Sequence, residues 1–236
     1  MITTTTTTTK LSRCQYGSLC GYTKPIEYAT ILRDLQNLPD EHGWPVEGGE
    51  WDRKSRGQQL TIDIYGADEQ KNLFVVQVRQ SIRRRASYYL QIRKSYFLIG
   101  RNENENAFAH CVSATAIRAA INHEGDVVNP LTAVNAALKW IWQTDRYMHV
   151  IRHGDVALLP VKSVPRHPAT GAHVEMVIDS HQIWSPEIRR NGKLFARNPY
   201  LHHIKNQHPD VKCTGWCQVL VGRREPAWSF APVTVD

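Results

Sequence analysis

The sequence predicts an α+β protein, in which an antiparallel β-meander with three helices packs with a compact C-terminal β-domain. From Leu60 onward apolar side chains recur at every second position, as in Leu60, Ile62 and Ile64, and this is the period of a half-buried strand. Other segments repeat apolar residues every three or four positions, which is the period of a helix. The composition, 42% hydrophobic and 22% charged, is typical of a globular protein.

The N-terminal part contains one helix and one irregular loop. Residues 1–9 include the threonine tract Thr3 to Thr9, which we expect to be disordered. Apolar residues at helical spacing then predict a helix over about residues 25–38. Residues 39–59 are rich in glycine and proline and contain Trp44 and Trp51, so this loop is a candidate surface for a protein partner with two aromatic anchors.

The meander follows this loop. Its strands are predicted at residues 60–65, 73–82, 87–93, 96–100 and 107–112, with polar turns between them. Ser113 precedes a second helix over residues 114–122, and Asn129 can cap a third helix that begins at Pro130 and ends near Gln143. Beyond Asp145 the chain returns to strands at residues 155–161, 174–178, 193–196 and 216–221. We therefore divide the chain into a disordered tract (1–9), a basic α+β part (10–148) and a histidine-rich β-domain (149–236).

Cysteine usage and hydropathy indicate a compartment. Five cysteines cannot all pair with one another, which favours free thiols, a reducing environment and a cytoplasmic location. The intervals Cys14 to Cys20 and Cys213 to Cys217 do not form the two-residue knuckle common in zinc sites. No apolar run approaches twenty residues, so no membrane association is expected.

Positive charge is concentrated in the meander. Between Gln70 and Asn102 there is no acidic residue, although the net charge of the whole chain is only +7. Arginines, lysines and tyrosines alternate in this segment, a pattern that suits phosphate contacts and base stacking. The candidate nucleic-acid-binding residues are Arg79, Arg83, Arg84, Arg85, Tyr88, Arg93, Lys94, Tyr96 and Arg101. The alternative is a solvated sheet face whose tyrosines pack in the core.

Histidine is concentrated in the C-terminal part, where eight of the eleven lie between residues 149 and 208. Histidine and carboxylate side chains together are typical ligands of zinc and other divalent metals. Asp179 and His181 share one face of an extended segment, and a later segment brings further histidines. The candidate metal ligands are Asp179, His181, His208, His173 and His203, with Glu175 as a further acid or ligand; the alternative is histidines in exposed loops.

A run from Arg152 to Val161 begins Arg152-His153-Gly154-Asp155-Val156, and a later segment reads Gly215-Trp216-Cys217-Gln218-Val219 followed by Arg223-Arg224-Glu225. Over about residues 151–226 this pattern resembles a family of small, largely uncharacterised bacterial and phage β-proteins. The family's Gly-His-x-His element would fall on residues 178–181, where Asp179 replaces the first histidine and His181 keeps the second. The resemblance implies a compact histidine-bearing β-domain and supplies no reaction.

The sequence leads to three functional hypotheses. The first is a cytosolic nucleic-acid-associated binding or accessory protein whose β-domain holds a divalent metal such as zinc. The second is a metal-dependent enzyme that uses the Asp/His site, and the third is a structural subunit of a larger assembly. Glycine-rich phosphate loops, dinucleotide fingerprints and the common hydrolase motifs are missing from the sequence, so no nucleotide cofactor is expected.

Overall fold

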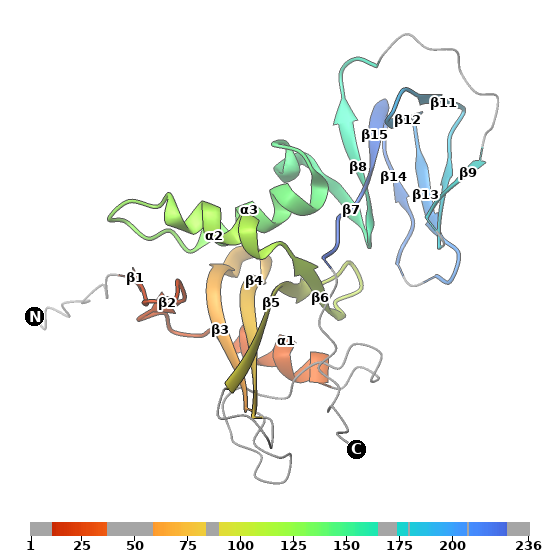
Figure 1. Ribbon diagram of the computed structural model, residues 1–236. Coiled ribbons are helices and arrows are strands. Elements are labelled where there is room, and N and C mark those ends of the chain that lie inside the picture. The colour runs from red at the N-terminus through yellow and green to blue at the C-terminus, as the bar shows by residue number, and fades with distance from the viewer. Residues whose placement is uncertain are drawn as a thin grey trace, which may run out of the picture. The chain divides into compact units, whose positions relative to one another are not determined.

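The computed structural model describes residues 11–36, 59–83, 90–164, 174–178, 180–206 and 208–225 (Figure 1). The chain forms two compact units. Unit 1 comprises Met1–Gly100, Ala107–Ala137 and Glu225–Asp236, and unit 2 comprises Arg101–Asn106 and Leu138–Arg224. The boundary between the two units thus falls after Ala137, whereas the sequence predicts the boundary between the basic part and the β-domain after residue 148. The predicted threonine tract and the loop with Trp44 and Trp51 lie outside the described residues.

Unit 1 is built on a four-stranded sheet in the order β3-β4-β5-β6. Its strands are β3 (Gln59–Asp68), β4 (Leu73–Arg83), β5 (Leu90–Arg101) and β6 (Ala107–Val112). The two runs predicted at 87–93 and 96–100 are one strand, β5, because the polar residues between them pair with β4: Arg79 lies opposite Lys94 and Val78 opposite Ser95. Cross-strand hydrogen bonds therefore continue through a segment whose composition suggested a break.

One face of this sheet packs against α1 (Ile26–Gln36). Tyr28, Ile31, Leu32 and Leu35 recur at helical spacing and are all buried. They join the side chains of alternating sheet positions, including Phe74, Val76 and Val78, in one hydrophobic cluster. The period-two and period-3.6 patterns of the sequence therefore meet in this core.

The remaining elements that belong wholly or partly to unit 1 are two helices and a disulfide-bonded hairpin. The helix α2 (Ala114–Asn122) is capped by Ser113, whose Oγ accepts a hydrogen bond from the Ala116 N–H. The helix α3 (Leu131–Trp142) follows, and the short strands β1 (Ser12–Arg13) and β2 (Leu19–Cys20) pair with each other. A disulfide joins Cys14 to Cys20, so the prediction of free thiols is wrong for this pair, whereas Cys111, Cys213 and Cys217 are free. Two cysteines six positions apart on a hairpin lie close enough to bond, with Cα atoms 5.5 Å apart.

Unit 2 contains two antiparallel sheets. The five-stranded sheet has the order β11-β12-β15-β8-β7 and the four-stranded sheet the order β14-β13-β10-β9. The strands are β7 (Ile151–His153), β8 (Val156–Val161), β9 (Val174–Ile178), β10 (His181–Trp184), β11 (Glu187–Arg190), β12 (Leu194–Arg197), β13 (Tyr200–His203), β14 (Val211–Lys212) and β15 (Trp216–Val221). Leu158 and Val219 of one sheet share a hydrophobic cluster with Ile183 and Leu201 of the other. Unit 2 is therefore a small β-sandwich.

The α+β class predicted from the sequence is confirmed, with three α-helices and several antiparallel sheets among the described residues. Within the same residues, none of the helices has the length and apolar character needed to cross a membrane.

Candidate metal centre

Four histidine rings meet in unit 2. His153 ends β7, His181 begins β10, His203 ends β13, and His208 lies in the segment that follows β13. β10 and β13 pair in a register that places His181 directly opposite His203, so their side chains leave the sheet on the same face. β7 belongs to the other sheet of the sandwich. The four rings therefore come from both sheets.

The spacing of the rings suits a single metal ion. His181, His203 and His208 each offer one ligand nitrogen, and these three atoms lie within 4.8 Å of one another. The ring centroids of His181 and His203 are 4.7 Å apart, and that of His208 lies 6.0 Å from His181 and 5.1 Å from His203. The centroid of His153 is 5.2 Å from that of His181, 5.4 Å from that of His208 and 6.5 Å from that of His203. Four imidazoles bound tetrahedrally to zinc by bonds of about 2.0 Å have centres about 5 Å apart.

The rings are buried and carry unpaired nitrogen atoms. His153 is fully buried, and His181 and His203 are each only 2% exposed. Among the described residues, no hydrogen-bond partner is found for either nitrogen of His153, for Nε2 of His181 or for Nδ1 of His208. Buried polar atoms in proteins almost always have a partner, and a bound ion or water is one of the few partners that a cluster of this kind can have. The group of His181, His203 and His208 can therefore hold a metal ion.

Two contacts define which nitrogen faces the centre. Ser180 Oγ lies 3.2 Å from Nδ1 of His181 and can accept a hydrogen bond from its N–H; in that tautomer the lone pair is on the unpartnered Nε2. In His203 the backbone N–H of Lys205 donates to Nδ1, so in the metal-free ring Nε2 carries the proton. Metal binding through Nε2 of His203 would require that proton to move to Nδ1 and this hydrogen bond to open.

The surroundings keep the rings uncharged. Burial lowers the pKa of His153 to about 4, and the neighbouring His208 and His203 add to this effect, while the Pro209 carbonyl and Asp210 oppose it. Burial likewise lowers the pKa of His181 to about 4, with further lowering by the other three rings. The pKa of His203 is also lowered, first by burial and then by His208. Neutral imidazoles are the form that binds a metal, so these rings are ready ligands at neutral pH.

Gly154 allows the rings of His208 and His181 to approach the backbone closely. A Cβ atom at this position would lie 2.6 Å from Nε2 of His208 and 3.2 Å from Nε2 of His181. The residue also has a φ of +62°, which side-chain-bearing residues rarely adopt. Only glycine fits both the turn after β7 and the approach of the two rings.

A carboxylate borders the centre. Glu103, in the Arg101–Asn106 part of unit 2, places its Oε2 3.4 Å from Nδ1 of His208. Its Oε1 lies 3.7 Å from Nε of Arg152, whose Nε also donates to the Gly154 carbonyl. A carboxylate beside one nitrogen of a histidine favours the proton there and leaves the other nitrogen to a metal. Glu103 is thus placed to orient His208.

The predicted metal ligands divide into three groups. His181, His203 and His208 come together as described. His173 and Asp179 lie outside the described residues, as does the side chain of Glu175. His202, the neighbour of His203, points away from the cluster and pairs with Asp210, with 2.8 Å between Nδ1 and Oδ1.

Sequence reasoning did not assign His153 or Glu103 to the site. His153 stood in the Arg152-His153-Gly154-Asp155 run, and the glycine after it was the available signal of a close backbone approach. Glu103 lies in a turn of alternating asparagine and glutamate, and nothing in that pattern indicates a partner more than a hundred residues away.

The predicted nucleic-acid-binding residues are only partly described. Arg84, Arg85 and Tyr88 lie outside the described residues, and so do the side chains of Arg83 and Arg93. Arg79 donates from Nε to Thr61 Oγ1, and Arg101 donates to the Glu105 carbonyl. Tyr96 is 1% exposed, so the prediction that it stacks on bases is wrong: period-two alternation turned its ring into the core, where Gln77 and Tyr65 contact it. Lys94 remains at the rim of a hollow in unit 1.

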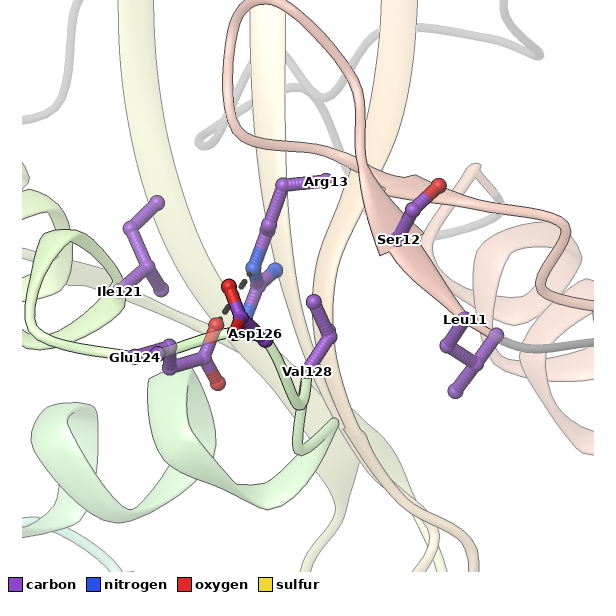
Figure 2. Close-up of a pocket in the computed structure, with 8 residues that line it drawn as sticks. Leu11, Ser12, Arg13, Ile121, Glu124, Asp126 and Val128 are labelled. Carbon is purple, nitrogen blue, oxygen red and sulfur yellow. Dashed lines mark hydrogen bonds and ion pairs between the residues drawn. The ribbon is translucent and has the colours of Figure 1, made fainter.

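Two hollows flank Arg13 in unit 1. One, of about 490 Å³, is lined by Arg13 together with Glu124 and Asp126, and Figure 2 shows the ion pair between Arg13 and Glu124, whose Nε and Oε2 are 2.8 Å apart. Burial opposes ionisation of Glu124, but the hydrogen bonds from Arg13 and Thr132 lower its pKa overall. Arg13 and Glu124 therefore neutralise each other, and Asp126 leaves the lining of this hollow with one formal negative charge, which does not favour an anion.

No protein-family model, curated protein or solved structure matches this chain. The resemblance of residues 151–226 to small bacterial and phage β-proteins therefore stays a prediction.

Proposed function

We propose that this protein binds one divalent transition-metal ion, with zinc as the preferred ion, through His153, His181, His203 and His208. The observation that carries the proposal is the convergence of four rings, three of them buried, in which the nitrogens of His153 and Nε2 of His181 have no hydrogen-bond partner among the described residues. An all-imidazole set suits zinc, copper, nickel or iron far better than magnesium or calcium. The near-tetrahedral spacing of the rings favours zinc among these.

The same donor set favours a structural role for the metal. A site closed by four protein ligands leaves no position for a substrate, and in such sites the ion holds the fold together. His153 belongs to one sheet of the sandwich and the other three ligands follow or lie on strands of the other, so the ion would join the two sheets. We infer that the β-domain is a metal-stabilised scaffold within a binding or accessory protein.

The ligand set is tested by metal analysis of protein purified without a polyhistidine tag. One zinc per chain is expected, and His181→Ala or His203→Ala should weaken binding by about a hundredfold or more. The matched control is His202→Ala, because this histidine is adjacent to His203 but pairs with Asp210 on the other side of the strand. The proposal would be contradicted if the protein carried less than one zinc per chain and this content were the same in all three variants.

The enzyme hypothesis requires an open coordination position at the same site. If His153 is not a ligand, three histidines remain and the fourth position is open to water, as in catalytic zinc sites. X-ray absorption of the zinc-loaded protein distinguishes the two, because outer-shell scattering from the imidazole carbons corresponds to four histidines in the closed site and to three in the open site. His153→Ala should change the spectrum only in the closed case.

Nucleic-acid association stays a proposal that rests on the charge of residues 71–101. Binding of single- and double-stranded oligonucleotides at two salt concentrations tests it, because each phosphate contact steepens the salt dependence. Absent or salt-insensitive binding would count decisively against it. The cytoplasmic location likewise stays a prediction.

A further inference from the structure

The second hollow beside Arg13 is lined by positive charge. It has a volume of about 390 Å³, and three different elements supply its cations: Arg13 from β1, Lys94 from β5 and Arg118 from α2. None of the described residues that line it is acidic. It differs in this respect from the neighbouring hollow, where Glu124 and Asp126 face Arg13 (Figure 2).

Two of the three cations, Lys94 and Arg118, are held in place by aromatic groups that do not neutralise them. Arg118 donates from Nε to the hydroxyl of Tyr96, and its guanidinium carbon lies 5.9 Å from the centre of that ring. Lys94 places its Nζ 5.6 Å from the ring centre of Tyr16. Within the described part of the chain, neither cation forms an ion pair with a carboxylate. Both charges are therefore available to an anion.

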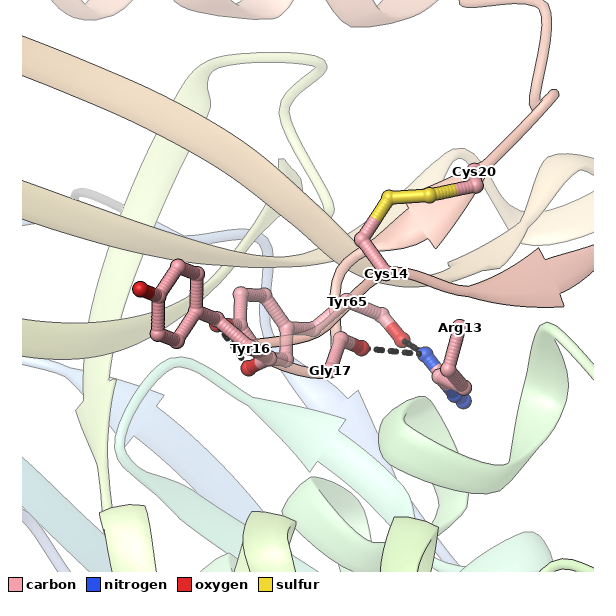
Figure 3. Close-up of a disulfide and its surroundings, with 6 residues drawn as sticks. All are labelled: Arg13, Cys14, Tyr16, Gly17, Cys20 and Tyr65. Carbon is pink, nitrogen blue, oxygen red and sulfur yellow. Dashed lines mark hydrogen bonds between the residues drawn. A yellow bond between two sulfur atoms is a disulfide. The ribbon is translucent and has the colours of Figure 1, made fainter.

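Arg13 adds a donor that lacks an acceptor. Its Nε pairs with Glu124 and its Nη1 donates to the carbonyls of Gly17 and Tyr65, as Figure 3 shows for the two carbonyls. Its Nη2 is buried and has no hydrogen-bond partner among the described residues. These contacts fix the guanidinium of Arg13 in the wall of the hollow, and a guanidinium suits an oxyanion, although Glu124 offsets its charge.

An exposed aromatic ring borders the same hollow. Tyr16 lines it and is 66% exposed. The backbone of Tyr16 is fixed between the disulfide-bonded Cys14 and Cys20, and its carbonyl accepts a hydrogen bond from the Tyr65 hydroxyl (Figure 3). At Gly17 a Cβ atom would lie 2.8 Å from Cδ1 of Ile121, and φ is +94°, so the loop follows the helix closely at this point. A ring on a fixed loop can stack on a flat base.

We propose that this hollow binds a nucleoside 5′-phosphate, with the phosphate between Arg13, Lys94 and Arg118 and the base against Tyr16. A volume of about 390 Å³ lies within the range of small-ligand sites and admits one nucleotide rather than a duplex. The phosphate monoester has two sources, a free nucleotide or the 5′-phosphorylated end of a single strand. The inference is independent of the metal centre, because it uses residues of unit 1 alone.

The full-length protein is titrated with adenosine 5′-monophosphate, adenosine and inorganic phosphate by calorimetry. Adenosine 5′-monophosphate is expected to bind and adenosine to bind much more weakly. Arg118→Gln and Lys94→Gln should each weaken the monophosphate about tenfold, because each removes a charged partner of the phosphate. Tyr16→Ala should weaken the monophosphate and leave the affinity for inorganic phosphate unchanged.

The matched control is Arg33→Gln, which removes the same charge from an exposed position on α1 and should change affinity by less than about twofold.

Decathymidylate with and without a 5′-phosphate distinguishes the two sources of the phosphate. If the terminal phosphate tightens binding beyond that of the free monophosphate, the site is assigned to a strand end, and equal affinity assigns it to the free nucleotide. The proposal is overturned if adenosine binds as tightly as its monophosphate, if Arg33→Gln weakens binding as much as Arg118→Gln, or if no phosphate compound binds at millimolar concentration. Should one pocket variant not fold, the other decides.

Discussion

Gly154 is the residue at which the backbone comes closest to the histidine rings, and its substitution gives a sharp test. In Gly154→Ala the new Cβ would lie 2.6 Å from Nε2 of His208, so the ring must move away from the metal position. We expect the zinc affinity to fall by about tenfold or more, together with a loss of about 1–3 kcal/mol in stability from the positive φ. Competition with a chromogenic chelator measures the affinity.

Gly192 provides the matched control for this change. It has nearly the same backbone conformation, with φ +63°, but nothing lies within 4 Å of its Cβ position. Gly192→Ala should therefore reproduce the conformational cost without the loss of zinc affinity. Equal affinity in the two variants would contradict the placement of Gly154 against the rings.

The buried histidines also make the metal-free protein sensitive to acid. The pKa values of His153 and His181 are about 4, whereas an unperturbed histidine has 6.5. Above pH 6.5 both rings are neutral in the folded and the unfolded chain. Between pH 6.5 and 4 only the unfolded chain takes up these protons, so the free energy of unfolding falls by up to about 1.4 kcal/mol per pH unit for each ring, and this loss ends below pH 4.

Urea unfolding of the chelator-treated protein over this pH range measures the effect. His153→Asn removes one of the two groups and should make the decline shallower, and His149→Asn, which changes an exposed residue, should not. A constant stability from pH 6.5 to 4.5 would show that the rings are not held in their neutral form.

At the scale of single residues, the sequence located part of the metal centre. His181, His203 and His208 could be selected because they lie in one histidine-rich segment. His153 and Glu103 could not, since their proximity depends on which strands pair and how the sheets stack. Likewise the period-two rule does not say which side of β5 the core covers, so the sequence alone could not decide between base stacking and core packing for Tyr96.

Among the elements, a single buried hydroxyl joins three strands. Ser185 follows β10, accepts hydrogen bonds from the backbone N–H groups of Glu187 in β11 and Arg197 in β12, and contacts the carbonyls of the same two residues. Ser185→Ala leaves these partly buried backbone groups without their partner. We expect a loss of about 1–3 kcal/mol in stability, measured by urea unfolding. The exposed Thr214→Ala is the control and should change stability by less than about 0.5 kcal/mol; an equal effect of both would remove the special role of Ser185.

Elements with strong periodicity were predicted well and short ones were not. The helix over 114–122 and the strands over 107–112, 174–178 and 216–221 have the bounds that the sequence indicates. β10, β11, β13 and β14 were missed, because each has four residues or fewer and contains histidine, arginine or lysine. In such strands the buried half of the pattern is too short to be recognised, and their formation depends on partners from distant parts of the chain.

At the scale of the whole molecule, metal removal should affect the two units differently. All four histidines belong to unit 2, and the core of unit 1 around α1 contains none of them. An ion present at about a thousand times its dissociation constant stabilises the folded form by about 4 kcal/mol. Chelation should therefore increase hydrogen exchange in peptides of β10 and β13 and leave those of β3 and β4 unchanged.

Hydrogen exchange followed by mass spectrometry, with and without zinc, measures this difference. His181→Ala should make unit 2 insensitive to the chelator while the rest of the pattern is preserved. If both units respond to chelation to the same degree, the ion does not act through the histidine centre alone.

The histidine doublet on β13 has a consequence for how the strand finds its partner. His203 faces His181 and His202 faces outward, so a shift of β13 by one position would present His202 to the centre in place of His203. Metal binding does not discriminate against this shifted register, because either register places an imidazole at the centre. Leu201 can, because it is fully buried between the sheets and would be turned into water by the shift. The burial of Leu201, which does not contact the ion, therefore selects the correct register of β13 around the ligands.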